Sequence, residues 1–83
     1  DPAVVRREDG SWLLDGALPA SEAADVLGAP PFPGAEEGLF ETLAGFVVAQ
    51  IGHLPGAGEA FLWRGHRFEV VDVDGHRVDR VLV

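Results

Sequence analysis

The chain has 83 residues, 47% of them hydrophobic, and its 14 acidic residues against six arginines give a formal net charge of −8. This length fits one domain with one core, and without a run of about 18 apolar residues we expect no direct membrane insertion. Nucleic acid and anionic membranes are disfavoured as partners because an acidic surface repels them, although the acidity also serves to keep a small domain soluble. Cysteine is absent, which excludes disulfides, thiolate metal sites and cysteine nucleophiles.

The N-terminal third predicts a hairpin followed by a short helix. Val4–Arg7 and Ser11–Asp15 are short runs with apolar residues on either side of a Glu-Asp-Gly turn, and we expect them to pair. Pro19 suits the first position of a helix, with Ser21 as an alternative cap, and Gly28 is the expected stop. The apolar residues at helical spacing between them are Ala20, Ala23, Ala24 and Leu27.

A proline-rich connector and a second helix follow. Three prolines within residues 29–34 prevent a helix there, and Phe32 is the expected anchor of this connector to the core. The second helix opens at Thr42 and ends at Gly52. Its apolar stripe consists of Leu43, Phe46, Val47 and Ile51. Gly45 inside this helix costs about 1 kcal/mol relative to alanine, so we expect it to mark close approach to a strand or another backbone.

The C-terminal third predicts a meander of three antiparallel strands. The first strand covers residues 59–64, and Arg64-Gly65 turns it into the second. Residues 67–83 then form a hairpin in which Asp74-Gly75 is a two-residue type I′ turn. We therefore expect an α+β fold, with two short helices packed on a mostly antiparallel sheet that ends in this meander.

The predicted register of the meander determines which side chains share a face. It places Phe61 opposite Phe68 and Phe68 opposite Val81, as one row beneath the second helix. The hairpin would expose its apolar residues on two different faces. Phe68, Val70 and Val81 lie far from the turn on one face, and Val71, Val73 and Val78 lie near it on the other. Because this alternation breaks, we expect a bulge or strong twist near Val70-Val71 and Val78-Asp79, or cover on both faces.

Asp72 and Asp74 are weak candidates for metal ligands. They precede Gly75 as in part of a calcium loop, but the further oxygen ligands and the distal glutamate of such a loop are missing. A turn explains this segment better, with Asp72 paired across the strands to Arg77. The three histidines lie in or beside predicted turns and lack metal-binding spacing. We therefore expect no metal and no cofactor.

Catalysis is not predicted, and the remaining candidates concern interaction. Both serines have turn or helix-start explanations, and the glycines of residues 56–58 precede a strand, where a dinucleotide loop requires a helix after it. We expect a protein that is not an enzyme. The interaction candidates are Trp12 and Trp63, for which core packing is the more ordinary use, and the near-turn valines Val71, Val73 and Val78 where the domain does not cover them.

Several motifs follow one another along nearly the whole chain. They are Asp9–Gly16 (DGSWLLDG), Leu27-Gly28, Thr42–Val47 (TLAGFV), Leu54-Pro55 with Gly58-Glu59, Arg67–Val70 (RFEV) and Asp74–Val81 (DGHRVDRV). Each motif alone is weakly specific, but the ordered set resembles the CorC/HlyC transporter-associated domain. The chain departs from the family in its small Ala20 and Ala23, where larger aliphatic residues are usual. The resemblance implies a fold similar to a subdomain of FAD-binding oxidases, without an established flavin site and without catalytic residues.

The resemblance also implies a function and a cellular setting. Residues 1–83 would be a single domain excised from a longer membrane protein, on the cytoplasmic face of the cell membrane. The expected function is a non-catalytic accessory or regulatory domain at the C-terminus of a magnesium/cobalt-type efflux or haemolysin-like protein, modulating ion transport through domain contacts. Its partners would be the transmembrane region and the paired cystathionine β-synthase-type (CBS-type) modules of that protein, with a homodimer as a further candidate. The alternative is a small domain that senses a cation or nucleotide through its acidic surface.

Overall fold

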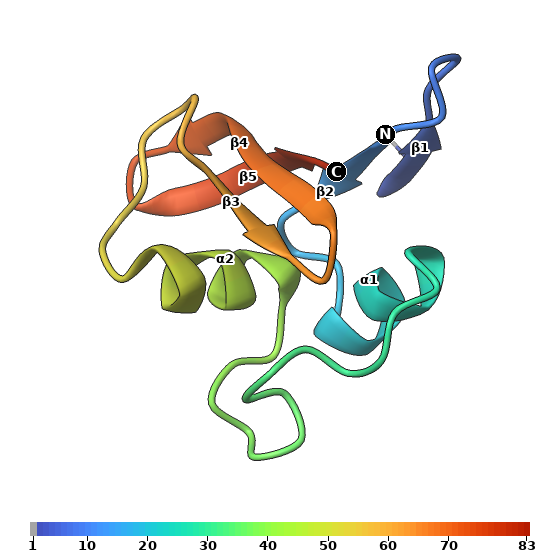
Figure 1. The fold of residues 1–83 in the computed structure, drawn as a ribbon. Coiled ribbons are helices and arrows are strands. Elements are labelled where there is room, and N and C mark those ends of the chain that lie inside the picture. The colour runs from blue at the N-terminus through green and yellow to red at the C-terminus, as the bar shows by residue number, and fades with distance from the viewer. Residues whose placement is uncertain (1) are drawn as a thin grey trace.

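Two short helices lie on one face of a five-stranded antiparallel sheet (Figure 1). The computed structural model describes residues 2–83. In chain order the elements are β1 (Val4–Arg6), β2 (Trp12–Asp15), α1 (Ala20–Val26), α2 (Leu43–Ile51), β3 (Ala60–Trp63), β4 (His66–Asp74) and β5 (Arg77–Leu82). The strands lie side by side in the order β1-β2-β5-β4-β3. The predicted α+β class and the C-terminal meander β3-β4-β5 are confirmed.

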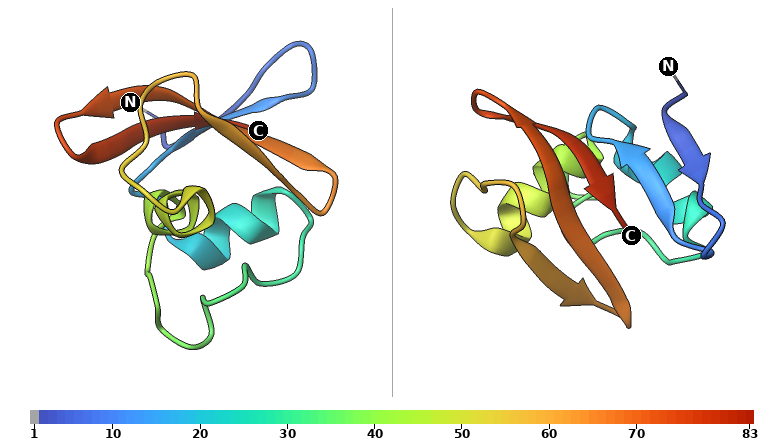
Figure 2. Two further views of the ribbon diagram at one scale, coloured as in Figure 1. Left: turned by 60° about the vertical axis from the view of Figure 1, so that its left-hand side comes forward. Right: turned by 90° about the horizontal axis from the view of Figure 1, so that it is seen from above.

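The first helix begins at Ala20, one residue later than predicted from Pro19. Pro19 occupies the N-cap of α1, and Gly28, which follows the helix, has a φ of +65°. The starts of the two helices are tied together, because the Ala20 N–H donates to the Glu41 carbonyl at 2.9 Å and the Leu43 N–H donates to the Leu18 carbonyl at 2.9 Å. Figure 2 shows the two helices together under the sheet. The three alanines of α1 are buried: Ala20, Ala23 and Ala24.

The second helix has a side-chain cap at its start and a glycine at its end. The Thr42 hydroxyl accepts a hydrogen bond from the Gly45 N–H at 3.2 Å, and Gly52 ends α2 with a φ of +88°. A Cβ atom at Gly45 would lie 2.6 Å from the Cβ atom of Phe40. The close approach predicted at Gly45 is therefore confirmed, and its neighbour is the Phe40 side chain of the connector, not a strand.

The two turns of the meander differ in type. The predicted Arg64-Gly65 turn is confirmed, and because Arg64 and Gly65 both have positive φ, of 48° and 81°, it is of type I′. The second turn is Gly75-His76, because Asp74 pairs with Arg77, and only Gly75 has positive φ. This is the pattern of a type II′ turn, which places glycine at the first central position. The predicted Asp74-Gly75 turn is therefore wrong by one residue.

A bulge lies between β4 and β5 at the predicted place. The pairing shifts between Val70 and Asp72 and again before Val73, so that Val71 and Asp79 stand outside the regular ladder. Because the turn lies one residue later than predicted, Val70 pairs with Val81; the extra residues Val71 and Asp79, one on each strand, cancel. The predicted pairing of Phe68 with Val81 is wrong, whereas Phe61 does pair with Phe68.

The bulge also corrects the prediction of two apolar faces. Val78 is 2% exposed and belongs to the same core as the far residues Phe68, Val70 and Val81. Val73 is half-buried against that core, and Val71 alone of the three near-turn valines is exposed, at 37%. The bulge adds one residue to each strand. An added residue reverses the alternation of side chains between the two faces beyond it, so Val73 and Val78 point inward.

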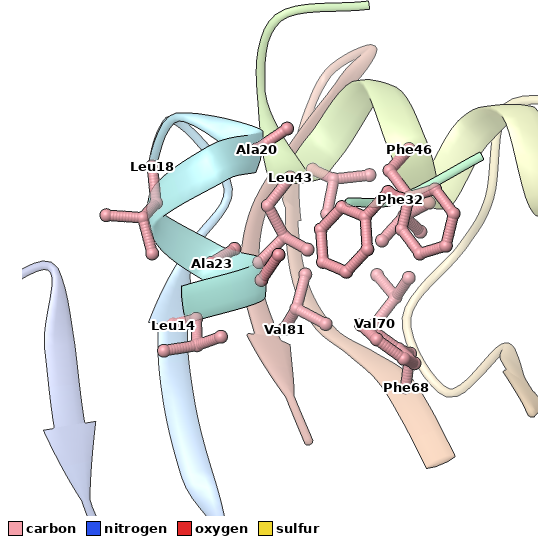
Figure 3. Packing of buried hydrophobic residues seen from close by; sticks show 13 residues of the cluster. Leu14, Leu18, Ala20, Ala23, Phe32, Leu43, Phe46, Phe68, Val70 and Val81 are labelled. Atoms are coloured by element: carbon pink, nitrogen blue, oxygen red, sulfur yellow. The ribbon is translucent and has the colours of Figure 1, made fainter. Parts of the chain in front are cut away.

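The core lies between the helices and the inner face of the sheet, and its aromatic centre includes a residue of the connector (Figure 3). Phe32 is 2% exposed and stacks on Phe46 of α2, with ring centroids 4.1 Å apart. Phe61 and Phe68 stack at 4.9 Å on the sheet, and Phe46 meets both edge-on. The predicted anchoring role of Phe32 is confirmed.

Candidate interaction groove beside the β4-β5 hairpin

A groove of about 590 Å³ lies where three segments of the chain meet. These segments are the turn after β2, the first residues of α2 and the β4-β5 hairpin, and the lining residues are Asp15, Gly16, Ala17, Thr42, Ala44, Asp72, Arg77, Val78, Asp79 and Arg80. Gly16 holds the segments together, because its N–H donates to the Asp79 carbonyl at 2.8 Å and its carbonyl accepts from the Ala44 N–H at 2.9 Å. Backbone hydrogen bonds thus hold the three segments of the groove together.

Arg77 is the charged centre of the groove. Its guanidinium donates to Asp79 at 2.7 Å and to Asp74 at 3.0 Å. The hydrogen bond that Arg77 donates to Asp79 raises the pKa of Arg77 above its ordinary value, with further contributions from the charges of Asp79, Asp74 and Asp15. Arg77 is mostly exposed, so this ion-pair network orients side chains more than it stabilises the fold. The predicted pairing of Asp72 with Arg77 is replaced by these partners.

The carboxylates of the groove are matched by arginines. Arg80 lies opposite Asp15 on β2 and opposite Asp72 on β4 in the strand register, so the central strand places an arginine between two acidic residues. Asp74 is already engaged by Arg77. Within residues 2–83 there is no group of three or more histidine, aspartate or glutamate side chains that could hold a metal ion. The arrangement favours contact with a polar surface that carries both signs of charge.

An apolar depression of about 500 Å³ adjoins the groove and shares Ala44, Arg77 and Val78 with it. The connector contributes Leu39 and Phe40, and α2 contributes Gly45, Val48 and Ala49. Leu39 is 76% exposed, the largest exposed fraction among the large hydrophobic residues described. An apolar centre beside a charged rim is the usual composition of a protein contact surface.

The structure separates the interaction candidates that were predicted from the sequence. Trp12 is half-buried beneath the Arg6 guanidinium, which lies 4.5 Å from the ring centre. Trp63 is half-buried and packs edge-on against Phe32 at 5.1 Å. Val78 is buried and cannot belong to an exposed patch, so the three near-turn valines do not form one surface.

Sequence reasoning missed Gly16 and Leu39. Gly16 looked like an ordinary end of a strand, and its contact with Val78 joins segments far apart in the sequence. A local signal existed for Leu39, since it is an apolar residue that follows a glycine-rich acidic loop and has no helical or strand periodicity around it.

None of the three histidines lines the groove, and His76 at the hairpin turn lines the adjoining depression. His53 contacts Glu59 at 2.7 Å, and the same carboxylate accepts the Gly56 N–H at 2.6 Å. The Gly56 hydrogen bond, followed by that of His53, lowers the pKa of Glu59. This contact closes the loop between α2 and β3.

No helix within the described residues is long and apolar enough to cross a membrane. The sequence model of the family described as "Transporter associated domain" (CorC/HlyC) matches residues 5–83. The UPF0053 protein sll0260 of Synechocystis sp. is 45% identical over 83 residues, which are all of this chain and 18% of that protein. The polyamine export protein of Escherichia coli strain K12 is 36% identical over 80 residues, covering 96% of this chain and 17% of that protein. The chain thus spans less than a fifth of these relatives.

Solved structures share the fold over nearly the whole chain. The CorC/HlyC domain of a Xylella fastidiosa Temecula1 hemolysin, in complex with Mg²⁺ and Mn²⁺, superposes with a TM-score of 0.84 at 44% identity, covering 98% of this chain and 94% of that one. The CorC/HlyC domain from Nitrosomonas europaea superposes with a TM-score of 0.88 at 32% identity, covering 99% and 94%. On the family match and these relatives, the chain belongs to the CorC/HlyC transporter-associated domain family.

Proposed function

We propose that this chain is a non-catalytic accessory domain at the C-terminus of a larger cation-export membrane protein, on its cytoplasmic side. The observation that carries the proposal is that the chain is a folded unit with its own core, yet accounts for only 17–18% of relatives that include a polyamine export protein. A unit of this kind acts on the larger protein through contacts. The transported cation is a polyamine or a divalent ion such as Mg²⁺ or Co²⁺.

The distribution of polar groups supports a non-catalytic role. Among the described residues no polar or charged residue is buried, and the pKa shifts fall on exposed side chains such as Asp9 and Arg77. Catalytic acids and bases commonly lie in desolvated clefts, where their pKa values are strongly displaced. The groove beside the hairpin holds ion pairs, and the one hydroxyl in its lining, that of Thr42, caps α2.

We assign the contact with the rest of the parent protein to the groove and the adjoining apolar depression. Leu39 would insert into a segment of the parent, and Asp15, Arg77 and Arg80 would meet its polar rim. The segment that binds the groove would lie in the rest of the parent protein, which in the relatives makes up about four-fifths of the chain length. It would belong to the transmembrane region or to the CBS-type modules proposed to precede this domain.

The test is cation export by the parent protein with and without residues 1–83. The truncated protein should still insert into the membrane, but its export rate or its response to cation concentration should change. A finer variant is Leu39→Asp, with Leu54→Asp as the control, because Leu54 is also exposed but lies outside the groove. Export that is unchanged in the truncated protein would overturn the proposal.

A second function is favoured by one relative. The Xylella fastidiosa domain, 44% identical, is in complex with Mg²⁺ and Mn²⁺. A cation-sensing role would use the surplus of carboxylates of this chain. Titration of the chain with Mg²⁺, Co²⁺ and adenine nucleotides, followed by backbone amide shifts, tests it directly. Saturable shifts that Asp72→Asn or Asp74→Asn abolishes would support sensing at the hairpin, and their absence near residues 72–74 would remove that site.

A further inference from the structure

Strand β3 is an edge of the sheet, paired with β4 on one side only. Figure 2 shows it at the margin of the sheet when the molecule is seen from above. Because the Arg64-Gly65 turn has two residues, Trp63 and His66 form a hydrogen-bonded pair, and hydrogen-bonded and open pairs then alternate along the ladder. The hydrogen bond from the Val70 N–H to the Glu59 carbonyl, at 2.9 Å, fits this alternation.

In this alternation the backbone N–H and C=O groups of Ala60 and Leu62 point away from β4. Both residues form open pairs, with Glu69 and Arg67, so their N–H and C=O groups face the free edge. Within residues 2–83 no turn, loop or side chain supplies a hydrogen bond to these groups. They form a short, regular row of donors and acceptors whose spacing matches that of another strand.

The edge lacks the features that usually prevent strand pairing. Its sequence, Ala-Phe-Leu-Trp, contains no charge, no proline and no bulge, and Leu62 is 73% exposed. The opposite edge, β1, is only three residues long and carries Arg6, with Arg7 directly after it. Charges on a short edge strand oppose pairing with another chain, so β3 is the open edge of the two.

We propose that β3 pairs antiparallel with β3 of a second copy of this chain, about a two-fold axis at Phe61. Ala60 then lies opposite Leu62 of the second copy, and this register pairs every outward N–H and C=O group of both strands. The next register, centred on Leu62, would set Ala60 against Arg64. Arg64 lies in the turn with a φ of 48° and cannot continue the ladder, which excludes that register.

Side chains and charges fit this pairing. On the side of the sheet that faces the helices the two Phe61 rings meet at the axis, and on the other side the small Ala60 lies beside the large Leu62 of the second copy. The antiparallel arrangement brings the Glu59 end of each strand to the Arg64 end of the other. The net charge of −8 on each copy opposes association, so salt should strengthen it by screening the long-range repulsion.

Sedimentation velocity of the 83-residue chain over a wide concentration range tests the pairing. We expect a reversible dimer whose dissociation constant falls as salt is added. Leu62→Lys should raise that constant about tenfold or more, because the charged lysine would lose its hydration against β3 of the second copy. Leu39→Lys is the matched control, since it also replaces an exposed leucine but one that lies on the connector beside α2 and the hairpin turn and not on β3, and it should leave the constant unchanged.

Two further measurements separate this interface from any other. Ala60→Pro removes an outward N–H at the first residue of an edge strand, where proline is tolerated, and should weaken the dimer while circular dichroism shows an intact fold. The amides of Ala60 and Leu62 should exchange slowly at high protein concentration and rapidly at low concentration. A monomer at every concentration, or a dimer in which these two amides exchange freely, would overturn the proposal.

Discussion

Gly16 lies so close to the backbone of Val78 that a Cβ atom at residue 16 would overlap the Val78 carbonyl group. Gly16→Ala must therefore push β5 away from the turn after β2. It should lower the free energy of unfolding by about 3 kcal/mol, the upper part of the range for overpacked sites. Urea denaturation measures the change. Gly56→Ala is the control, because a Cβ there meets only the Glu59 carboxylate at 3.9 Å, and it should change stability by less than about 1 kcal/mol.

Phe32 holds the proline-rich connector to the core through its stacking on Phe46. Phe32→Ala would leave a cavity under α2 and should lower the free energy of unfolding by about 4 kcal/mol. Phe32→Leu keeps more of the buried volume and should cost less than half as much. Thermal or chemical denaturation distinguishes the two. If Phe32→Ala proved as stable as the substitution of the exposed Pro30 by alanine, the connector would not be anchored as described.

The hydroxyl of Thr42 caps α2 by accepting the Gly45 N–H. Thr42→Ala should lower the free energy of unfolding by about 1 kcal/mol, and Thr42→Ser, which retains the hydroxyl, should restore most of it. Hydrogen exchange localises the effect, since the amide of Gly45 should exchange faster in the alanine variant. Equal exchange rates in the alanine and serine variants would contradict the cap.

Glu59 gives the fold a defined acid dependence. Its pKa lies below the ordinary value of 4.5, mainly through the Gly56 N–H and then through His53. A lowered pKa in the folded state means that the ionised carboxylate stabilises the fold fully above pH 4.5, and that this contribution is lost as the pH falls through the lowered value. The stability difference between the wild-type chain and Glu59→Gln should thus be constant near neutrality and shrink in acid.

An NMR titration of the Glu59 carboxyl group separates its two partners. His53→Asn should raise the pKa of Glu59 only part of the way to 4.5, because the larger contribution comes from the Gly56 N–H, which remains. A full return to 4.5 in this variant would mean that the loop bond from Gly56 does not persist in solution.

The helices could be predicted from the sequence because their ends carry local signals. Pro19 and Gly28 bound α1, and Thr42 and Gly52 bound α2, within a residue of the expected positions. These signals act through neighbours in the chain and need no knowledge of the tertiary fold. The same holds for the Arg64-Gly65 turn, whose register follows from two adjacent residues.

The register of the last hairpin could not be fixed in the same way. Asp74-Gly75 and Gly75-His76 both suit a two-residue turn, the first with glycine second and the second with glycine first. Burial decides between them, because the observed register and bulge together place Val78 in the core. Predicting the groove would have required the contact between Gly16 and Val78, for which no local pattern exists in the sequence.

The bulge also determines at which positions of the last two strands selection acts. Every second residue of β4 is covered up to Val70, whereas beyond the bulge the covered residue is Val73. In a library of single substitutions sorted for folded protein, tolerance to substitution should alternate with a period of two residues along β4. This alternation should be interrupted by one residue at residue 71. An insertion or deletion elsewhere in the hairpin would turn core side chains to solvent. The bulge is therefore the place where this hairpin can gain or lose a residue in evolution.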